Sequence, residues 1–186
     1  MSEPYFPEKV TFFCGLIYRE DLYSIEEVLI LLERVISIDS NPLIHEEKNC
    51  SLNEYYEKEM GERNGLKRIW VFSSTFDDRD FLLMKKKMTN LIEVEQREKF
   101  NMEGRPLNID PGYIGLEQVV LATNKPYSHR IYFGEGIYGE LTYQYLNKSW
   151  CTLPWTYPDY RLDKVLNLFE VARDQLKKQL KVSKSQ

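Results

Sequence analysis

The sequence predicts an α+β fold in a single domain over residues 1–186. Between about residue 8 and residue 110, strand-like and helix-like segments follow in the order β, α, β, β, α, β, the split βαβ pattern of a ferredoxin-like core. From about residue 111 to 182, short apolar segments separated by turn residues predict antiparallel hairpins, and a long amphipathic segment predicts a C-terminal helix. A hydrophobic fraction of 42% in 186 residues can supply one substantial core.

Composition disfavours several classes of protein. No apolar run approaches the roughly 20 residues of a membrane helix, so no membrane partner is expected. The first residues lack the basic and apolar regions of a signal peptide, which favours a cytoplasmic protein. The three cysteines, Cys14, Cys50 and Cys151, are widely spaced, which disfavours a disulfide framework or a metal site of the zinc type. A net charge of −4 disfavours nucleic acid as a partner without excluding a local basic patch.

The first strand and the first helix have clear signals. The segment from Lys9 to Tyr18 is rich in β-branched and aromatic residues, which predicts a central strand buried on both faces. Ser24 and Glu27 have the spacing of a capping box, so a helix is expected to begin after Ser24. Its apolar residues at helical intervals are Val28, Leu31, Leu32 and Val35.

The next two strands are expected on either side of a polar excursion. The apolar segment from Ile36 to Ile44 contains Asn41-Pro42, which predicts a bent strand near the sheet edge. Residues 45–65 are polar and predict a loop or a short helical turn. The segment from Leu66 to Ser73 is apolar through its middle and predicts the third strand.

A second helix and a fourth strand complete the predicted core. Asp77 or Asp78 can cap this helix, and the lysines at 85–87 are expected to face solvent. The apolar stripe that should face the core consists of Phe81, Met84, Met88, Leu91 and Ile92. The segment from Arg105 to Asp110 predicts the fourth strand.

A fifth strand and a hairpin are predicted next. The strand is expected from Glu117 to Thr123. Gly134-Glu-Gly136 suits a three-residue connection in which Phe133 pairs with Ile137. In that register Arg130, Tyr132, Tyr138 and Glu140 share one face of the sheet.

A second hairpin and a long helix follow. A turn at Asn147-Lys148 would pair Tyr145 with Trp150. The last helix is expected to start between Asp159 and Asp163. Its apolar face consists of Leu162, Val165, Leu166, Phe169, Ala172, Leu176 and Leu180.

Asp110 has two possible roles. Asp110-Pro-Gly-Tyr113 has proline and glycine where a type II turn prefers them, so the simpler interpretation is a turn in which Asp110 accepts backbone hydrogen bonds. In the functional interpretation, Asp110 at a strand end acts as a base or a cation ligand.

His129 and Arg130 also allow two interpretations. Histidine can exchange protons near neutral pH, and arginine binds carboxylate or phosphate with a planar fork. Alternatively, His129 is a partly buried sheet residue and Arg130 pairs across the strands with Glu140. A buried Arg130 and Glu140 with two tyrosines would favour a specificity device or an anion pocket.

Two further motifs are weaker. Gly134-x-Gly136 is not a phosphate loop, because no Gly-Lys-Ser/Thr follows and the context is strand to strand. The chain lacks a Walker A motif, so GTP hydrolysis would need a different kind of site. Asp159 in Tyr157-Pro-Asp-Tyr160 is suited to a helix start, and the alternative is that it closes one wall of a cleft.

Several motifs together resemble one family. They are Gly15-Leu-Ile-Tyr18, Tyr55-Tyr-Glu-Lys-Glu-Met-Gly61, Thr89-Asn90, Asn108-Ile-Asp-Pro-Gly-Tyr113, Tyr127-Ser-His-Arg-Ile-Tyr132, Gly136-Ile-Tyr-Gly-Glu140 and Leu153-Pro-Trp-Thr-Tyr-Pro-Asp-Tyr160. They resemble an uncharacterised prokaryotic family, catalogued as a domain of unknown function, whose members are often labelled GTP-binding. The resemblance covers nearly the whole chain. It implies a small cytoplasmic bacterial or archaeal protein and supplies no established reaction.

Two functional hypotheses follow. The first is a site for a small anionic ligand, nucleotide-like, phosphorylated or carboxylated, with Arg130 holding the anion. The candidates for acid or base catalysis are Asp110 and His129. The candidate ligand-binding residues are Tyr113, Lys125, Arg130, Tyr132, Tyr138, Glu140 and Asp159. No cofactor or metal is identified.

The second hypothesis is a module that binds nucleic acid or protein through aromatic residues on the sheet. The candidate aromatics are Tyr132, Tyr138, Tyr143, Tyr145 and Trp150. Exposed aromatics without basic neighbours would indicate a protein partner or a homodimer.

Overall fold

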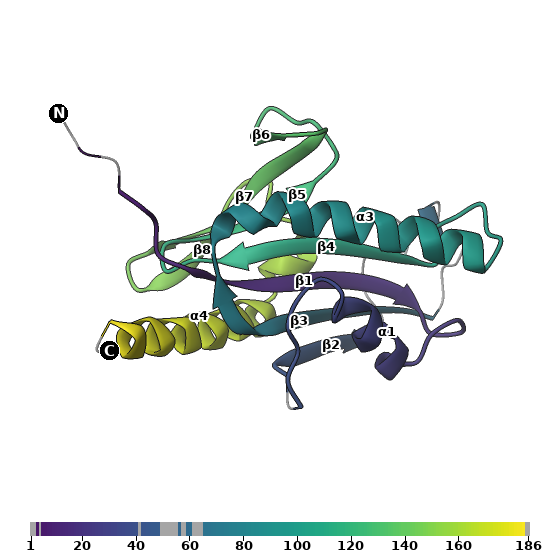
Figure 1. Cartoon of the computed structure of the whole chain (residues 1–186), viewed down its shortest axis with the longest axis horizontal. Helices are drawn as coiled ribbons and strands as arrows, with labels where there is room; N and C mark the ends of the chain where they lie inside the picture. Colours follow the sequence, from purple (N-terminus) through teal and green to yellow (C-terminus); the bar gives the residue numbers. More distant parts are fainter. Residues whose placement is uncertain are drawn as a thin grey trace.

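The computed structural model describes residues 3, 5–40, 42–48, 56, 59–60 and 65–184, and it is built on one antiparallel sheet of eight strands (Figure 1). Seven strands lie in the order β2-β3-β1-β4-β5-β7-β6, and β8 pairs with β7. The strands are β1 (Val10–Arg19), β2 (Ile44–Lys48), β3 (Leu66–Asp77), β4 (Leu107–Ile114), β5 (Gln118–Thr123), β6 (Arg130–Gly134), β7 (Ile137–Leu146) and β8 (Ser149–Thr152).

Helices cover both faces of the sheet. They are α1 (Ile25–Leu32), α3 (Leu82–Lys99) and α4 (Asp163–Ser183), with 3₁₀ turns η1 (Arg79–Phe81) and η2 (Pro158–Arg161) before the last two. Alternate residues of β1 point to opposite faces. Phe12 and Leu16 pack with Val28 of α1 and Ile92 of α3, whereas Phe13 packs with Phe169 of α4. In the described part of the chain, no helix combines the length and the apolar character needed to cross a membrane.

Several sequence predictions are confirmed. β1 is buried on both faces and lies between β3 and β4, as expected of the central strand. Ser24 caps α1, and both hydrogen bonds of the capping box with Glu27 are present. Tyr145 pairs with Trp150 across the turn at Asn147-Lys148.

The second strand was placed wrongly. The segment from Ile36 to Ile44 was expected to form a bent strand, but β2 begins at Ile44 and runs through residues expected to be loop. It does lie at the sheet edge. Ile36 is instead buried just after α1, where its N–H donates to the carbonyl of Leu32. An apolar segment that packs after a helix cannot be distinguished from a buried strand by composition alone. Most of the polar excursion lies outside the described residues.

The orientation of α3 was predicted only in part, since Ile92 is buried and Met88 packs against the core as expected. Met84 and Leu91, expected in the core, are exposed, as is Phe81 in the preceding turn. The buried side chains of α3 are Leu82, Lys86, Thr89, Ile92, Glu93 and Gln96. Lys86, expected in solvent, is only 4% exposed, and Lys85 is half-buried, so only Lys87 of the three lysines is exposed. The polar stripe of α3 faces the sheet because the backbone N–H and C=O groups of β4 have no strand partner on that side.

Two turns differ from the prediction. Asp110-Pro-Gly-Tyr113 is not a turn but part of β4, where Asp110 pairs with Gly15 and Gly112 with Phe13 of β1. In the first hairpin Gly134, rather than Phe133, pairs with Ile137, and the register shifts at Phe133. Beyond that bulge the expected pairs Tyr132 with Tyr138 and Arg130 with Glu140 are present.

Candidate functional site

The sheet is interrupted between β4 and β5. β4 begins at Leu107, but β5 pairs only with its last three residues, from Gly112 to Ile114. Pro111 has no N–H to donate, so the ladder with β5 starts one residue after it. The earlier half of β4 therefore has a free edge on the side away from β1, and Figure 1 shows β5 and β7 rising away from β4 there.

Two side chains of α3 satisfy this free edge. The carboxylate of Glu93 accepts a hydrogen bond from the N–H of Ile109 at 2.7 Å, and the ammonium of Lys86 donates to the carbonyl of the same residue at 3.2 Å. Burial raises the pKa of Glu93, and the charge of Lys86 opposes that rise. These hydrogen bonds explain why α3 faces the sheet with charged residues, since a buried backbone group left without a partner is costly.

A cleft opens at this free edge, and we name it the polar cleft. Charged residues of both signs line it, and it is narrow, with a cavity volume of about 70 Å³. These residues are Glu59, Lys86, Glu93, Arg105, Asp110 and Lys125. Tyr56 and Tyr157 complete its walls, and burial raises the pKa of Tyr157 to about 12. Cations and carboxylates that converge in this way can orient a polar ligand.

A chain of hydrogen bonds fixes the orientation of Asp110. Arg105 Nη1 donates to Asn108 Oδ1 at 2.8 Å, and Asn108 Nδ2 donates to Asp110 Oδ2, also at 2.8 Å. Arg105 also contacts the carboxylates of Glu59 and Glu93. Among the described residues, no cationic side chain forms an ion pair with Asp110. Asp110 therefore has acceptor capacity left for a ligand in the cleft.

Arg130 and Glu140 form a buried ion pair next to the polar cleft. The guanidinium Nη2 lies 2.6 Å from Glu140 Oε2, and both side chains are almost completely buried. The other donors of Arg130 reach the carbonyl of Lys125 at 2.8 Å and the hydroxyl of Tyr157 at 3.1 Å. Arg130, Glu140 and Asp110 line a narrow extension of the cleft. This pair fixes the cleft wall, because its donors are already used within the protein.

His129 lies on the outer side of this pair. Its Nε2 is 3.2 Å from Glu140 Oε2. Its ring is stacked between Tyr127, at 5.9 Å between centroids, and Trp155, at 4.8 Å. His129 does not line the polar cleft or its narrow extension.

Asp159 is buried beneath the site. Its Oδ2 lies 3.1 Å from Arg68 Nε, and the guanidinium of Arg68 stacks on Trp70 and Tyr160. Asp159 belongs to η2, ahead of the final helix. It therefore contributes to the packing below the cleft rather than to the cleft lining.

Two of the remaining predicted residues, Tyr113 and Tyr132, line a separate pocket, which we name the aromatic groove. It runs between the start of α3 and the β6–β7 hairpin and is lined by Arg79, Leu83, Tyr113, Tyr132 and Phe133, with Asp80 and Leu82. Tyr138 contacts Tyr132, with 5.2 Å between ring centroids. The predicted residues thus divide between two sites, with Asp110 and Lys125 in the polar cleft and Tyr113 and Tyr132 in the aromatic groove.

Sequence reasoning missed four residues of the polar cleft, namely Glu59, Lys86, Glu93 and Arg105. A signal was available in α3, because Lys86, Thr89, Glu93 and Gln96 are spaced by three or four residues and therefore lie on one face of a helix. A polar stripe of that kind, beside a strand with Asn108 and Asp110, indicates a buried polar site.

A comparison with protein families gives one match. The family model described as Domain of unknown function (DUF4416) matches residues 8–176. The chain belongs to this family. In this DUF4416 chain the match spans the sheet, the residues that line the polar cleft and the aromatic groove, and most of α4. No curated protein and no solved structure matches the chain.

Proposed function

We propose that the polar cleft binds a small anionic ligand, nucleotide-like, phosphorylated or carboxylated. The observation that carries this proposal is the position of Glu59. Its carboxylate contacts both the guanidinium of Arg105 and the ammonium of Lys125, which lies 3.3 Å away. Two cations from different loops thus converge on one carboxylate at the wall of the cleft. A carboxylate or phosphate group of a ligand would take the place of Glu59.

The opposite wall of the cleft favours a ligand with a hydrogen-bond donor. Asp110 accepts from Asn108 and forms no ion pair among the described residues, so a hydroxyl or amino group of the ligand would donate to it. Of the two residues predicted to exchange protons, only Asp110 lines the cleft. In an enzymatic version of this function Asp110 would be the base, with His129 acting through Glu140.

The strand order supports a finer description of the fold. The first four strands lie in the order β2-β3-β1-β4, all antiparallel, with α1 and α3 in the two connections. We infer a ferredoxin-like core in these residues, and a single domain completed by β5–β8 and α4. The polar cleft then lies where the core meets its extension.

The alternative function, an aromatic surface for bases, has less support. Tyr143 and Trp150 are buried in the contact with α4, and Tyr145 carries the guanidinium of Arg173 on its ring. Base stacking needs an accessible ring face. Of the five aromatic candidates, Tyr132 is the most exposed, and it lies in the aromatic groove.

A thermal-shift screen tests the proposal. Wild type, Lys125→Ala and Asp110→Asn are screened against nucleotides, phosphosugars, organic acids and short RNA. We expect at least one small anion to raise the melting temperature of wild type, with the shift reduced in both variants. Glu59→Gln should enlarge the shift, because it removes the carboxylate that competes for Arg105 and Lys125.

Lys87→Ala is the matched control, because Lys87 is an exposed lysine whose partner is Glu135 on the hairpin. Equal shifts in wild type and Lys125→Ala would contradict the site assignment. A response to RNA but to no small anion would contradict the ligand class.

A further inference from the structure

The residues ahead of β1 carry two large aromatic side chains with no packing of their own. Residues 5–9, which we name the leading segment, run away from the body of the molecule in Figure 1. Tyr5 is 81% exposed and Phe6 is 90% exposed. These are the highest exposures of any large apolar side chain in the described residues. Leaving both side chains in water loses the hydrophobic free energy that their burial would supply.

The leading segment leaves the molecule at the rim of the aromatic groove. The carbonyl of Glu8 accepts a hydrogen bond from Arg79 Nη2 at 3.1 Å, and Arg79 lines that groove. Arg79 Nε is buried and has no hydrogen-bond partner among the described residues. A segment that enters the groove could therefore supply a hydrogen-bond acceptor for Arg79 Nε.

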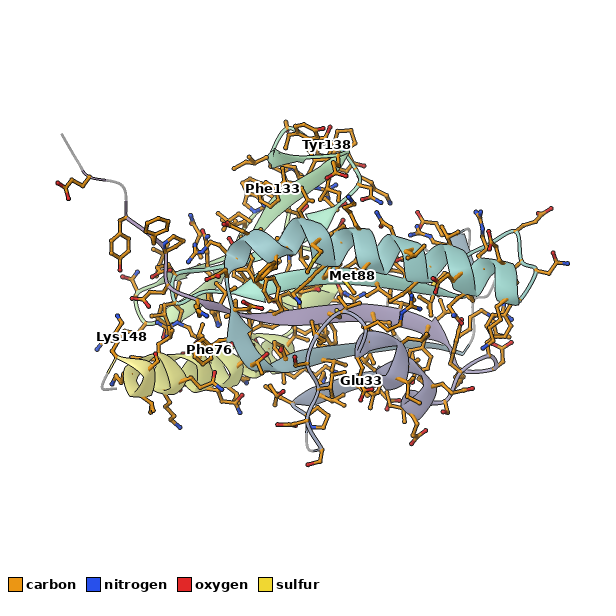
Figure 2. All side chains as sticks on the ribbon, in the orientation of Figure 1. Glu33, Phe76, Met88, Phe133, Tyr138 and Lys148 are labelled. Carbon is orange, nitrogen blue, oxygen red and sulfur yellow. The ribbon has the colours of Figure 1, made fainter. Side chains whose placement is uncertain are left out.

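The aromatic groove has the properties of a docking site for such a segment. It encloses about 520 Å³ and is lined mainly by aromatic and aliphatic side chains. Figure 2 shows Phe133 on the hairpin that stands beside α3, and Lys87 of α3 contacts Glu135 at the hairpin tip. Tyr132 and Phe133 remain 59% and 40% exposed. Grooves lined by aromatic rings are typical receptors for extended segments that contain proline.

The segment is too stiff to reach its own groove. The sequence places prolines at positions 4 and 7, on either side of Tyr5 and Phe6. Proline fixes its own φ and forces the preceding residue into an extended conformation. Only one residue, Pro7, separates Phe6 from the anchor at Glu8, and a return to the groove would need a complete reversal of direction within that length. The groove that receives Tyr5 and Phe6 is therefore expected on another molecule.

We propose that the chain forms a two-fold homodimer in which each copy inserts Tyr5 and Phe6 into the aromatic groove of the other. A two-fold axis beside Arg79 makes the exchange reciprocal, since the anchor and the groove are neighbours on the same surface. Two aromatic side chains bury roughly 300–400 Å² and cover a similar area of groove. Two reciprocal contacts then bury about 1,200–1,600 Å², the size of a standard stable interface.

The first test is the oligomeric state in solution, measured by sedimentation velocity over a range of concentrations. Wild type is expected to be a concentration-dependent dimer. Phe6→Asp and Tyr132→Asp, one on each side of the contact, should each weaken dimerisation by at least about tenfold. Ile30→Asp is the matched control, because Ile30 is an exposed apolar residue on α1 outside the lining of the groove, and it should leave the dimer unchanged. A wild type that stays monomeric at every concentration would overturn the proposal.

A crosslinking test identifies which groove is occupied. In a background with Cys50 and Cys151 replaced by serine, one tagged chain carries Phe6→Cys and a differently tagged chain carries Leu83→Cys. Oxidation of the mixture is expected to give a disulfide between the two tags. The same two cysteines in one chain are expected to give linked dimers. A disulfide within a single chain would show that the segment folds back onto its own groove, and a dimer without either link would show a different interface. Either result would refute the exchange.

Discussion

At the scale of single residues, replacing Arg130 alone should reduce stability much more than replacing Arg130 and Glu140 together. Arg130→Ala leaves the Glu140 carboxylate buried without its cation, so we expect the free energy of unfolding to fall by about 3–5 kcal/mol. Arg130→Met with Glu140→Met removes both charges and should recover at least half of that loss. Urea denaturation of the three proteins measures the difference. Equal losses in the single and the double variant would contradict this account.

The contacts of Arg130 within the protein make it a poor residue for probing the ligand site. Arg130 was predicted to hold the anion, but its donors reach Glu140, the carbonyl of Lys125 and Tyr157. A loss of binding in Arg130→Ala would therefore be confounded by a change in the cleft wall. Lys125 lines the cleft and its side chain is nearly half exposed, so Lys125→Ala is the cleaner probe.

At the scale of elements, the close packing of β4 against β1 and β5 depends on Gly112, which has no side chain. A Cβ at Gly112 would lie 2.6 Å from the ring of Phe13 and 2.7 Å from the carbonyl oxygen of Val120. A backbone oxygen cannot move aside cheaply, so Gly112→Ala should lower the free energy of unfolding by about 1–3 kcal/mol.

Gly115→Ala is the control for this substitution. A Cβ at Gly115 meets its nearest neighbours at 3.6 Å, which is ordinary van der Waals contact. Chemical denaturation of both variants makes the comparison. A loss at Gly115 as large as that at Gly112 would show that the close approach to β5 is not the cause.

The helices and strands also show which structural features can be predicted from sequence patterns. β1, α1, the β7–β8 turn and the register of Arg130 with Glu140 were predictable, because each depends on neighbours in sequence. The orientation of α3 was not, because hydrophobicity alone would turn Met84 and Leu91 inward. The helix instead presents Lys86 and Glu93 to Ile109, whose backbone lacks a strand partner on that side.

At the scale of the whole molecule, stability should fall at alkaline pH. Burial raises the pKa of Cys14 to about 12, and it raises the pKa of Tyr56, Tyr143 and Tyr160 further. In the unfolded chain these groups lose protons near 9.0 and 10.0. Their contribution is therefore complete below about pH 9 and is lost as the pH rises toward the folded values.

Urea midpoints measured at pH 8, 9, 10 and 11 check this expectation. Above the unfolded pKa, each such group should lower the free energy of unfolding by about 1.4 kcal/mol per pH unit. Tyr157→Phe removes one contributor, because burial raises the pKa of Tyr157 to about 12 as well, and should lessen the slope above pH 10. A midpoint that stays constant to pH 11 would contradict the prediction.

The sequence by itself determined several of the local elements. Capping, turn chemistry and alternation act over a few residues, so Ser24, Asn147-Lys148 and the pairing of Arg130 with Glu140 could be read from the chain. Only the tertiary structure decided which polar groups meet. Pro111 shortens the ladder with β5, the free edge of β4 draws in Lys86 and Glu93, and the cleft forms between them and Asp110. That convergence depends on hydrogen bonds between segments far apart in the sequence, so the polar stripe of α3 could indicate a buried polar site but not the groups that it meets.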